Sequence, residues 1–175
     1  MERVSIEDID PSTTDDHRSH DRRVLTGPLG TSDVAVVHYT LESGERFSGS
    51  LHAHMDQEEA FLVVEGEATF ETSASRSDAD EASGAPASET REVTVGPDEA
   101  IRFAPGEFQS GYNDGDERVV AFALGAPRDS RDVRITHIAG YGDISCPECG
   151  HDHMRIDPSK PDDELTCPEC GAGWN

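Results

Sequence analysis

Four cysteines near the end of the sequence form the pattern with the most specific chemistry. Two residues separate Cys146 from Cys149, and after 17 further residues Cys167 and Cys170 repeat this spacing. Each pair suits one side of a tetrahedral ion, and four thiolates fill the coordination sphere of Zn²⁺. The spacing therefore predicts a structural zinc site with no open position for catalysis, in preference to disulfides or a redox pair.

A second group of potential metal ligands lies in the stretch HAHMDQEEAFLVVEG, residues 52–66. Residues i and i+2 of a strand face the same side, so His52 and His54 can point together into a barrel. Glu59 follows a turn and begins the next strand, from which it can point back at the two imidazoles. Such a facial set suits Fe(II), Mn(II), Ni(II) or Zn(II). Two exposed strand histidines are the alternative interpretation.

The elements that would position these ligands are predicted to be strands. Short runs rich in Val, Phe and Ile are separated by turn residues, as in LESGER, VGPDE and NDGDE, and no long stretch has helical periodicity. This pattern favours an antiparallel all-β sandwich or barrel. We expect an acidic N-terminal arm over residues 1–22, the β domain over 23–140 and a separate module over 145–175. Residues 71–91 are rich in Ala, Ser, Asp and Glu and are predicted to be a flexible loop.

Two stretches of the β domain resemble the sequence motifs of the cupin superfamily. The order Gly, His-x-His-x4-Glu-x6-Gly in residues 44–66 resembles the first motif, with Glu59 and Gly66 at the expected offsets. Residues 96–113, GPDEAIRFAPGEFQSGYN, resemble the second motif through Gly96, Pro105-Gly106 and Asn113. The resemblance covers residues 23–127 and implies an antiparallel cupin barrel that pairs as a homodimer.

One position departs from this pattern. Gln109 stands four residues before Asn113, where the resemblance implies a third histidine that completes a metal set of three histidines and one glutamate. An amide oxygen binds divalent ions but is a poorer donor than imidazole for the later transition metals. We expect a metal in the barrel on His52, His54 and Glu59, with Gln109 as the fourth ligand or as a hydrogen-bonding neighbour.

The C-terminal module resembles a zinc ribbon. Its thirty or so residues cannot build a core of their own, so bound Zn²⁺ would supply the folding energy. His151 and His153 could compete as ligands, but we expect them on the surface. Residues 146–175 include seven acidic and two basic side chains, which makes nucleic acid an improbable partner. We expect the module to pack on the β domain or to contact a protein partner.

The overall charge limits the partners further. The net charge is −23, and Lys160 is the only lysine among 14 basic residues. We interpret this acidic surface as a halophile signature, with an ordinary acidic protein as the alternative. It disfavours anionic membranes and nucleic acid. No apolar span and no signal peptide are recognisable, so we expect a cytoplasmic protein.

Two function hypotheses follow. The first is a metal-dependent enzyme, an oxygenase or an isomerase, acting on a small molecule through the metal held by His52, His54, Glu59 and Gln109. The second is a non-catalytic sensor of a small ligand, or an interaction module, with a cupin barrel. The residues leave open whether the chain is an enzyme.

Four weaker candidates for functional residues are expected to be structural or exposed: His38, Tyr39, Arg102 and Tyr112.

Overall fold

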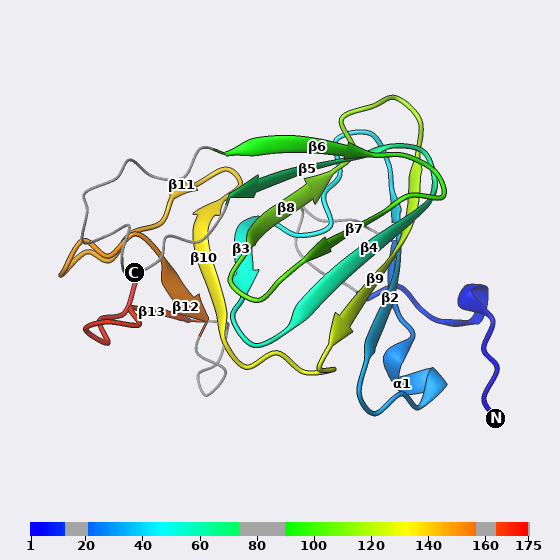
Figure 1. Ribbon diagram of the computed structural model, residues 1–175, viewed down its shortest axis with the longest axis horizontal. Helices are drawn as coiled ribbons and strands as arrows, with labels where there is room; N and C mark the ends of the chain where they lie inside the picture. Colours follow the sequence, from blue (N-terminus) through cyan, green and yellow to red (C-terminus); the bar gives the residue numbers. More distant parts are fainter. Residues whose placement is uncertain (13–20, 74–89, 157–163, 175) are drawn as a thin grey trace.

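The structure is a computed structural model that describes residues 1–12, 21–73, 90–156 and 164–174. Two antiparallel sheets face each other and close into a barrel (Figure 1). The first, sheet A, has the strand order β1-β2-β9-β4-β7. Its strands are β1 (Asp21–Val24), β2 (Ala35–Leu41), β4 (Glu58–Glu65), β7 (Ala100–Phe103) and β9 (Val119–Ala126).

The second sheet, sheet B, has the order β13-β12-β10-β3-β8-β5-β6, with β11 paired to β10. Its strands are β3 (Ser50–His54), β5 (Ala68–Ser73), β6 (Arg91–Val95), β8 (Phe108–Tyr112), β10 (Val133–Ile138), β11 (Gly142–Asp143), β12 (Met154–Ile156) and β13 (Leu165–Thr166). The helical segments of the described residues are short: η1 (Ile6–Asp8) and α1 (Thr26–Leu29). The predicted all-β antiparallel fold is confirmed.

Strand alternation places the core between the sheets. In β4, Phe61 and Val63 are buried while Leu62 and Val64 are exposed, because neighbouring side chains leave a strand on opposite faces. Phe61 packs against Phe47 and Phe70 across the barrel, with ring centroids 5.0 Å apart in both pairs. This aromatic cluster fills one part of the interior and leaves the ends of β3, β4 and β8 for polar side chains.

Gly66 is required by the turn from β4 to β5. Its φ of 74° lies in the left-handed region, and a Cβ there would lie 2.3 Å from the carbonyl oxygen of Arg118. A side chain at this position would therefore displace the backbone of the neighbouring strand β9. The glycine of the first motif thus has a structural role.

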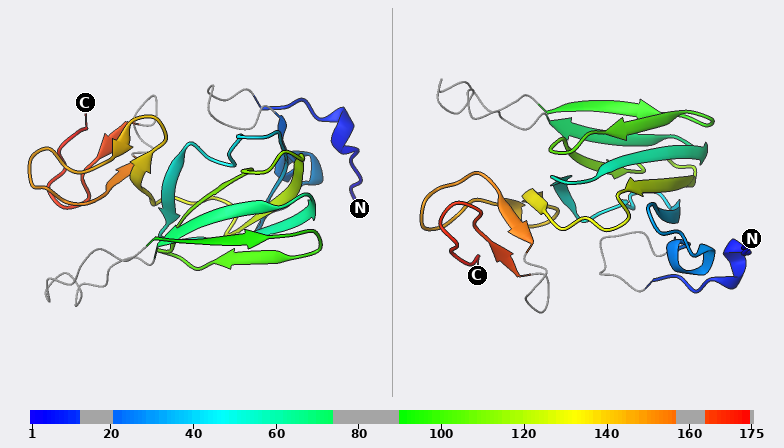
Figure 2. Two further views of the ribbon diagram at one scale, coloured as in Figure 1. Left: turned by 90° about the horizontal axis from the view of Figure 1, so that it is seen from above. Right: turned by 60° about the horizontal axis from the view of Figure 1, so that its bottom comes forward.

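The C-terminal module is continuous with sheet B. The strands of the C-terminal module lie beside the end of the barrel (Figure 2). Strand β12 pairs with β10, so that Ile135 lies opposite Met154. Both side chains are buried in a second core, which also contains Ile144, Cys146, Leu165 and Cys167. Packing of the module on the β domain is therefore observed.

Several expected boundaries shift in the structure. Strand β1 begins at Asp21, so Arg22 belongs to sheet A and not to the N-terminal arm. Residues 71–73 end strand β5, and Arg91 begins β6, whereas residues 74–89 of the expected loop lie outside the described residues.

No helix within the described residues is long and apolar enough to cross a membrane. Leu62, Val64 and Leu124 are exposed on sheet A. The expected homodimer stays a prediction.

Candidate metal centre

The structure brings together the four side chains expected in the barrel site. His52 and His54 come from β3, Glu59 from β4 and Gln109 from β8, where Gln109 pairs with His52 across the sheet. The Nε2 atom of Gln109 lies 2.8 Å from Oε2 of Glu59 and 3.2 Å from Nε2 of His52. Nε2 of His54 lies 3.7 Å from Oε2 of Glu59. One ligand atom from each of His52, His54 and Glu59 lies within 4.8 Å of the others.

The backbone around β3 orients the first imidazole. Nδ1 of His52 lies 3.1 Å from the carbonyl oxygen of Ser50 and 3.2 Å from Oγ of Ser48. A proton on Nδ1 that is donated to this carbonyl leaves the lone pair of Nε2 directed at Gln109 and Glu59. A fixed tautomer of this kind is typical of histidines that bind metals.

The neighbouring carboxylate, Glu58, points away from the site, as strand alternation predicts. Its Oε2 accepts a hydrogen bond of 2.7 Å from Arg102, and both side chains are more than half exposed. Arg102 is therefore an outward-facing partner of the acidic surface and does not line the barrel.

Burial disfavours the charged forms of both His54 and Glu59. Desolvation, together with the nearby His52, lowers the pKa of His54 to about 4. Desolvation raises the pKa of Glu59 to about 7, although the hydrogen bond from Gln109 and the charge of Arg22 act in the opposite direction. The site thus presents a neutral imidazole and a carboxyl group that lacks sufficient compensating positive charge.

These residues fit a divalent ion. Bonds of about 2.1 Å to such an ion place neighbouring ligand atoms about 3 Å apart, and Nε2 of His54 lies 3.7 Å from Oε2 of Glu59. The Oε1 atom of Gln109 is buried and has no hydrogen-bond partner in the described structure. Turning this amide over would place Oε1 beside Glu59 and His52, an arrangement that a cation between them, or a proton on Glu59, would stabilise. The amide therefore has a free oxygen for an ion at this position.

We expect metal binding at the barrel site to release more protons at pH 6 than at pH 8. With a pKa of about 7, Glu59 holds its proton in about nine of ten metal-free chains at pH 6 and in about one of ten at pH 8. His54, with a pKa of about 4, is neutral at both. Titration calorimetry with Mn²⁺ in buffers of different ionisation enthalpy measures the difference, and equal proton release at the two pH values would contradict it.

The same pKa affects stability in the metal-free state. The folded-state pKa of Glu59 lies above its ordinary value of 4.5, so the folded chain binds this proton more tightly than the unfolded chain. The contribution of Glu59 to the free energy of unfolding therefore decreases as the pH rises from about 4.5 to about 7. A bound cation reverses this effect, because it stabilises the carboxylate.

The four cysteines form the second candidate site. Sγ of Cys146 lies 3.5 Å from Sγ of Cys170, and Sγ of Cys149 lies 3.6 Å from Sγ of Cys167. Zn–S bonds of about 2.3 Å place tetrahedral sulfurs about 3.8 Å apart, so the cluster fits a zinc ribbon. Backbone N–H groups of Cys149 and Glu148 contribute to lowering the pKa of the Cys146 thiol to about 6, which favours its thiolate. Hydrogen bonds to Cys146 raise the pKa of Cys149 and of Cys170, so only an ion would make all four sulfurs thiolates.

The two cysteine turns have the same backbone hydrogen bonds. The N–H of Cys146 donates to the carbonyl of His151, and the N–H of Cys167 donates to the carbonyl of Ala172, each at 2.8 Å. Gly150 and Gly171 follow with φ of 75° and 74°. The repeated CPECG sequence therefore folds as two equivalent turns on opposite sides of the sulfur cluster.

His151 and His153 differ from the expectation that they lie on the surface. They lie where the C-terminal module meets the barrel, with their Nε2 atoms 3.1 Å apart. The side chain of His153 is 14% exposed, and its Nε2 accepts a hydrogen bond of 3.0 Å from Arg134. They are displaced from the surface because β12 pairs directly with β10.

Three weaker candidates lie outside the ligand set. His38 is on the outer face of sheet A against Phe122, with ring centroids 5.2 Å apart, and burial lowers its pKa. Tyr39 is buried in the core and packs against Phe47. The hydroxyl of Tyr112 donates to Glu92 at 2.6 Å. These contacts explain the three side chains without a catalytic role.

Arg22 was missed by the sequence analysis because it was assigned to the N-terminal arm. It pairs with Tyr39 in the sheet, donates from Nε to the Tyr39 hydroxyl at 3.1 Å, and is the cation that acts on Glu59. The segment DRRV has one apolar residue and no alternation of apolar and polar residues, so no local signal marks it as a strand.

No family model matches the sequence, and no curated protein matches it. Solved structures do match. A sugar phosphate isomerase of the cupin superfamily from Silicibacter pomeroyi has a TM-score of 0.59 at 17% identity, over 90% of this chain and 88% of that one. A protein from Klebsiella pneumoniae with a double-stranded β-helix domain has a TM-score of 0.52 at 18% identity, over 78% and 90%. This chain has the cupin fold.

Another solved structure that matches is an oxalate oxidase in complex with the substrate analogue glycolate. Its TM-score is 0.53 at 16% identity, over 73% of this chain and 60% of that one. Identities this low establish the fold alone. In this barrel Gln109 lies beside His52 and Glu59.

Proposed function

We propose that this cupin is a metal-dependent enzyme that acts on a small anionic molecule. The observation that carries the proposal is the convergence of His52, His54, Glu59 and Gln109 on one point, with a buried amide oxygen that lacks a partner. A divalent Fe, Mn, Ni or Zn ion bound there would supply Lewis acidity for an isomerisation, or a redox centre for an oxygenation.

The surroundings of the site support an anionic substrate. Arg22 brings a guanidinium group to the neighbourhood of Glu59 in a chain of net charge −23, and the Tyr39 hydroxyl and Ser12 hold this group by hydrogen bonds of 3.1 Å. A fixed arginine of this kind attracts and orients a carboxylate or a phosphate. Two of the similar structures, the sugar phosphate isomerase and the oxalate oxidase, are enzymes whose names indicate anionic substrates.

A non-catalytic sensor of a small ligand is the second candidate. Gln109 favours it, because an amide in place of imidazole weakens the binding of later transition metals. The zinc ribbon that continues sheet B could then transmit ligand binding to a protein partner. Both functions require a small ligand that enters the barrel, but only the enzyme converts that ligand into a product.

Metal analysis of the purified protein is the first test. We expect one zinc and one further divalent ion per chain, and the His52→Ala/His54→Ala variant should lose only the second ion. The matched control is His38→Ala, since His38 lies on the outer face of sheet A. A single zinc that remains in the double variant would contradict the barrel site.

Turnover separates the enzyme from the sensor. Oxygen uptake by the Fe(II)-loaded protein with diols, thiols, phenols and small carboxylates tests oxygenation, and aldose–ketose conversion of sugar phosphates tests isomerisation. Turnover that disappears in His54→Ala supports the enzyme. An absence of turnover together with a higher melting temperature in the presence of one of these compounds supports the sensor.

A further inference from the structure

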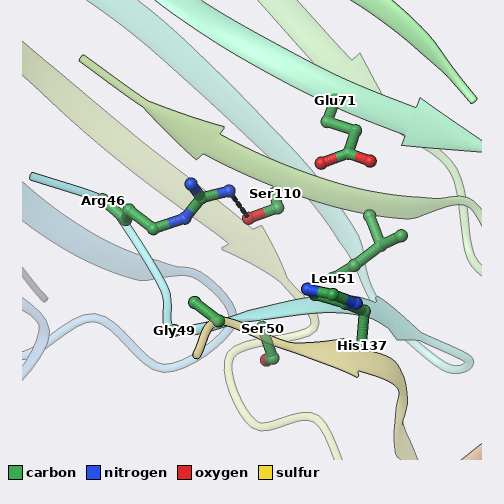
Figure 3. A pocket seen from close by; sticks show the side chains of 8 residues that line it. Arg46, Gly49, Ser50, Leu51, Glu71, Ser110 and His137 are labelled. Atoms are coloured by element: carbon green, nitrogen blue, oxygen red, sulfur yellow. Dashed lines mark hydrogen bonds between the residues drawn. The ribbon is translucent and has the colours of Figure 1, made fainter. Parts of the chain in front are cut away.

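A hollow of about 140 Å³ lies on the outer face of sheet B, away from the barrel site (Figure 3). Ser110 follows Gln109 in β8, and Glu71 follows the core residue Phe70 in β5, so both side chains leave the opposite face of the sheet. The residues that matter for its chemistry are Arg46, Leu51, Glu71, Ser110, His137 and Ala139.

Arg46 is held rigidly at one side of the hollow. Its NH2 group donates to Oγ of Ser110 at 3.1 Å, and its guanidinium lies 4.6 Å from the centre of the Tyr112 ring. Ser110 is 1% exposed, so this hydrogen bond is fixed inside the sheet. Nε of Arg46 is buried and therefore closed to a ligand, whereas its NH1 group has no hydrogen-bond partner among the described residues. The guanidinium is thus positioned and retains unused donor capacity.

Glu71 presents the opposite charge to the same hollow (Figure 3). Within the described residues no ion pair joins it to Arg46, which means that their charged atoms are more than 4.0 Å apart. Elsewhere on the protein arginines contact carboxylates directly, as in Arg118 with Glu65 at 3.0 Å. The sheet therefore holds one positive and one negative group apart across a small open space.

We propose that this hollow binds a small zwitterion, an α-amino acid with a short aliphatic side chain. Its carboxylate would accept hydrogen bonds from Arg46, and its ammonium group would donate to Glu71. Leu51 and Ala139 provide an apolar wall for a small side chain. The volume lies well below the 300–1,000 Å³ of sites for drug-sized molecules, so a large ligand is excluded.

Single charges fit the hollow less well than a zwitterion. A simple carboxylate would be attracted by Arg46 and repelled by Glu71, and a simple amine would experience the reverse. The matched probes are therefore L-alanine, propionate and ethylamine, which share the same two-carbon unit and carry both charged groups, only the carboxylate and only the ammonium group. Losing one charge-assisted hydrogen bond corresponds to about a tenfold change in affinity.

Titrations of the full-length, zinc-loaded protein, followed by NMR at constant ionic strength, test the proposal. We expect L-alanine to bind about tenfold more tightly than propionate or ethylamine. Glu71→Gln should weaken L-alanine about tenfold and at the same time strengthen propionate, because the repulsion is removed. Arg46→Gln should abolish the binding of both. The control is Glu65→Gln, an exposed carboxylate of sheet A, which should change none of the affinities.

Three results would overturn the proposal. These are the absence of saturable shifts with L-alanine, equal binding of L-alanine and propionate, and a Glu71→Gln variant that binds as the wild type does. If Arg46→Gln fails to fold, the Glu71→Gln comparison decides alone, since Glu71→Gln leaves the backbone pairing of β5 with β6 and β8 in place. The result is independent of whether the barrel binds a metal.

Discussion

Replacing Cys167 by serine should remove one zinc ion per chain and unfold the C-terminal module while sheet A remains folded. Cys167 is 3% exposed and contributes both a sulfur to the cluster and part of the second core. The apparent binding free energy of a structural zinc site is about 10–16 kcal/mol, far more than this small core provides. Without the fourth thiolate, the two cysteine turns beside β12 and β13 lose the ion that holds them together.

Hydrogen exchange and metal analysis measure this effect together. We expect amides of β12 and β13 to lose their protection, β10 to lose part of it, and sheet A to exchange as in the wild type. The exchange of β10 matters because Ile135 pairs with Met154 across the two parts of the chain. His151→Ala is the control, and it should retain zinc if the four thiolates fill the coordination sphere. Loss of zinc in His151→Ala would instead make this histidine a ligand.

Much of the fold could be predicted because the relevant signals are local. The apolar run from Phe61 to Val64, rich in β-branched residues and closed by Gly66, predicts a strand, and the structure then buries Phe61 and Val63 on one face. The spacing of the cysteines predicts a cluster for a similar reason, because each CPECG segment closes its own turn. The convergence of His52, His54 and Glu59 likewise depends on two strands that are consecutive in the chain, β3 and β4, which a short turn joins across the two sheets.

The remaining features depend on contacts between distant segments, which local patterns do not specify. The charge of Arg22 reaches Glu59 only because β1 joins the edge of sheet A. His151 and His153 become half-buried because β12 pairs with β10. The outer hollow combines side chains from residues 46 to 139, and no short stretch of sequence contains both its positive and its negative group.

Gln109→His should strengthen the binding of Zn²⁺, Ni²⁺ and Co²⁺ in the barrel by about 10- to 100-fold. The side chain is 2% exposed and already lies 2.8 Å from Glu59 and 3.2 Å from His52, so an imidazole of similar size begins at a ligand position. Imidazole is a better donor than an amide oxygen for these ions. Mn²⁺, which accepts oxygen ligands readily, should gain much less.

Gln109→Leu distinguishes the two roles left open for the native amide. Leucine keeps the volume but removes both the oxygen ligand and the hydrogen bond to Glu59. If Gln109 binds the ion directly, Mn²⁺ affinity should fall in the leucine variant while Glu59 and the two histidines still hold the ion weakly. If the amide only orients Glu59, the leucine variant should show a raised Glu59 pKa and a shifted pH dependence of binding, with a small loss of affinity above pH 8. Competition titrations with a chelator at pH 6 and pH 8 separate these outcomes. A lost ligand weakens metal binding at both pH values. A lost hydrogen bond weakens metal binding mainly at pH 6, where Glu59 still holds its proton.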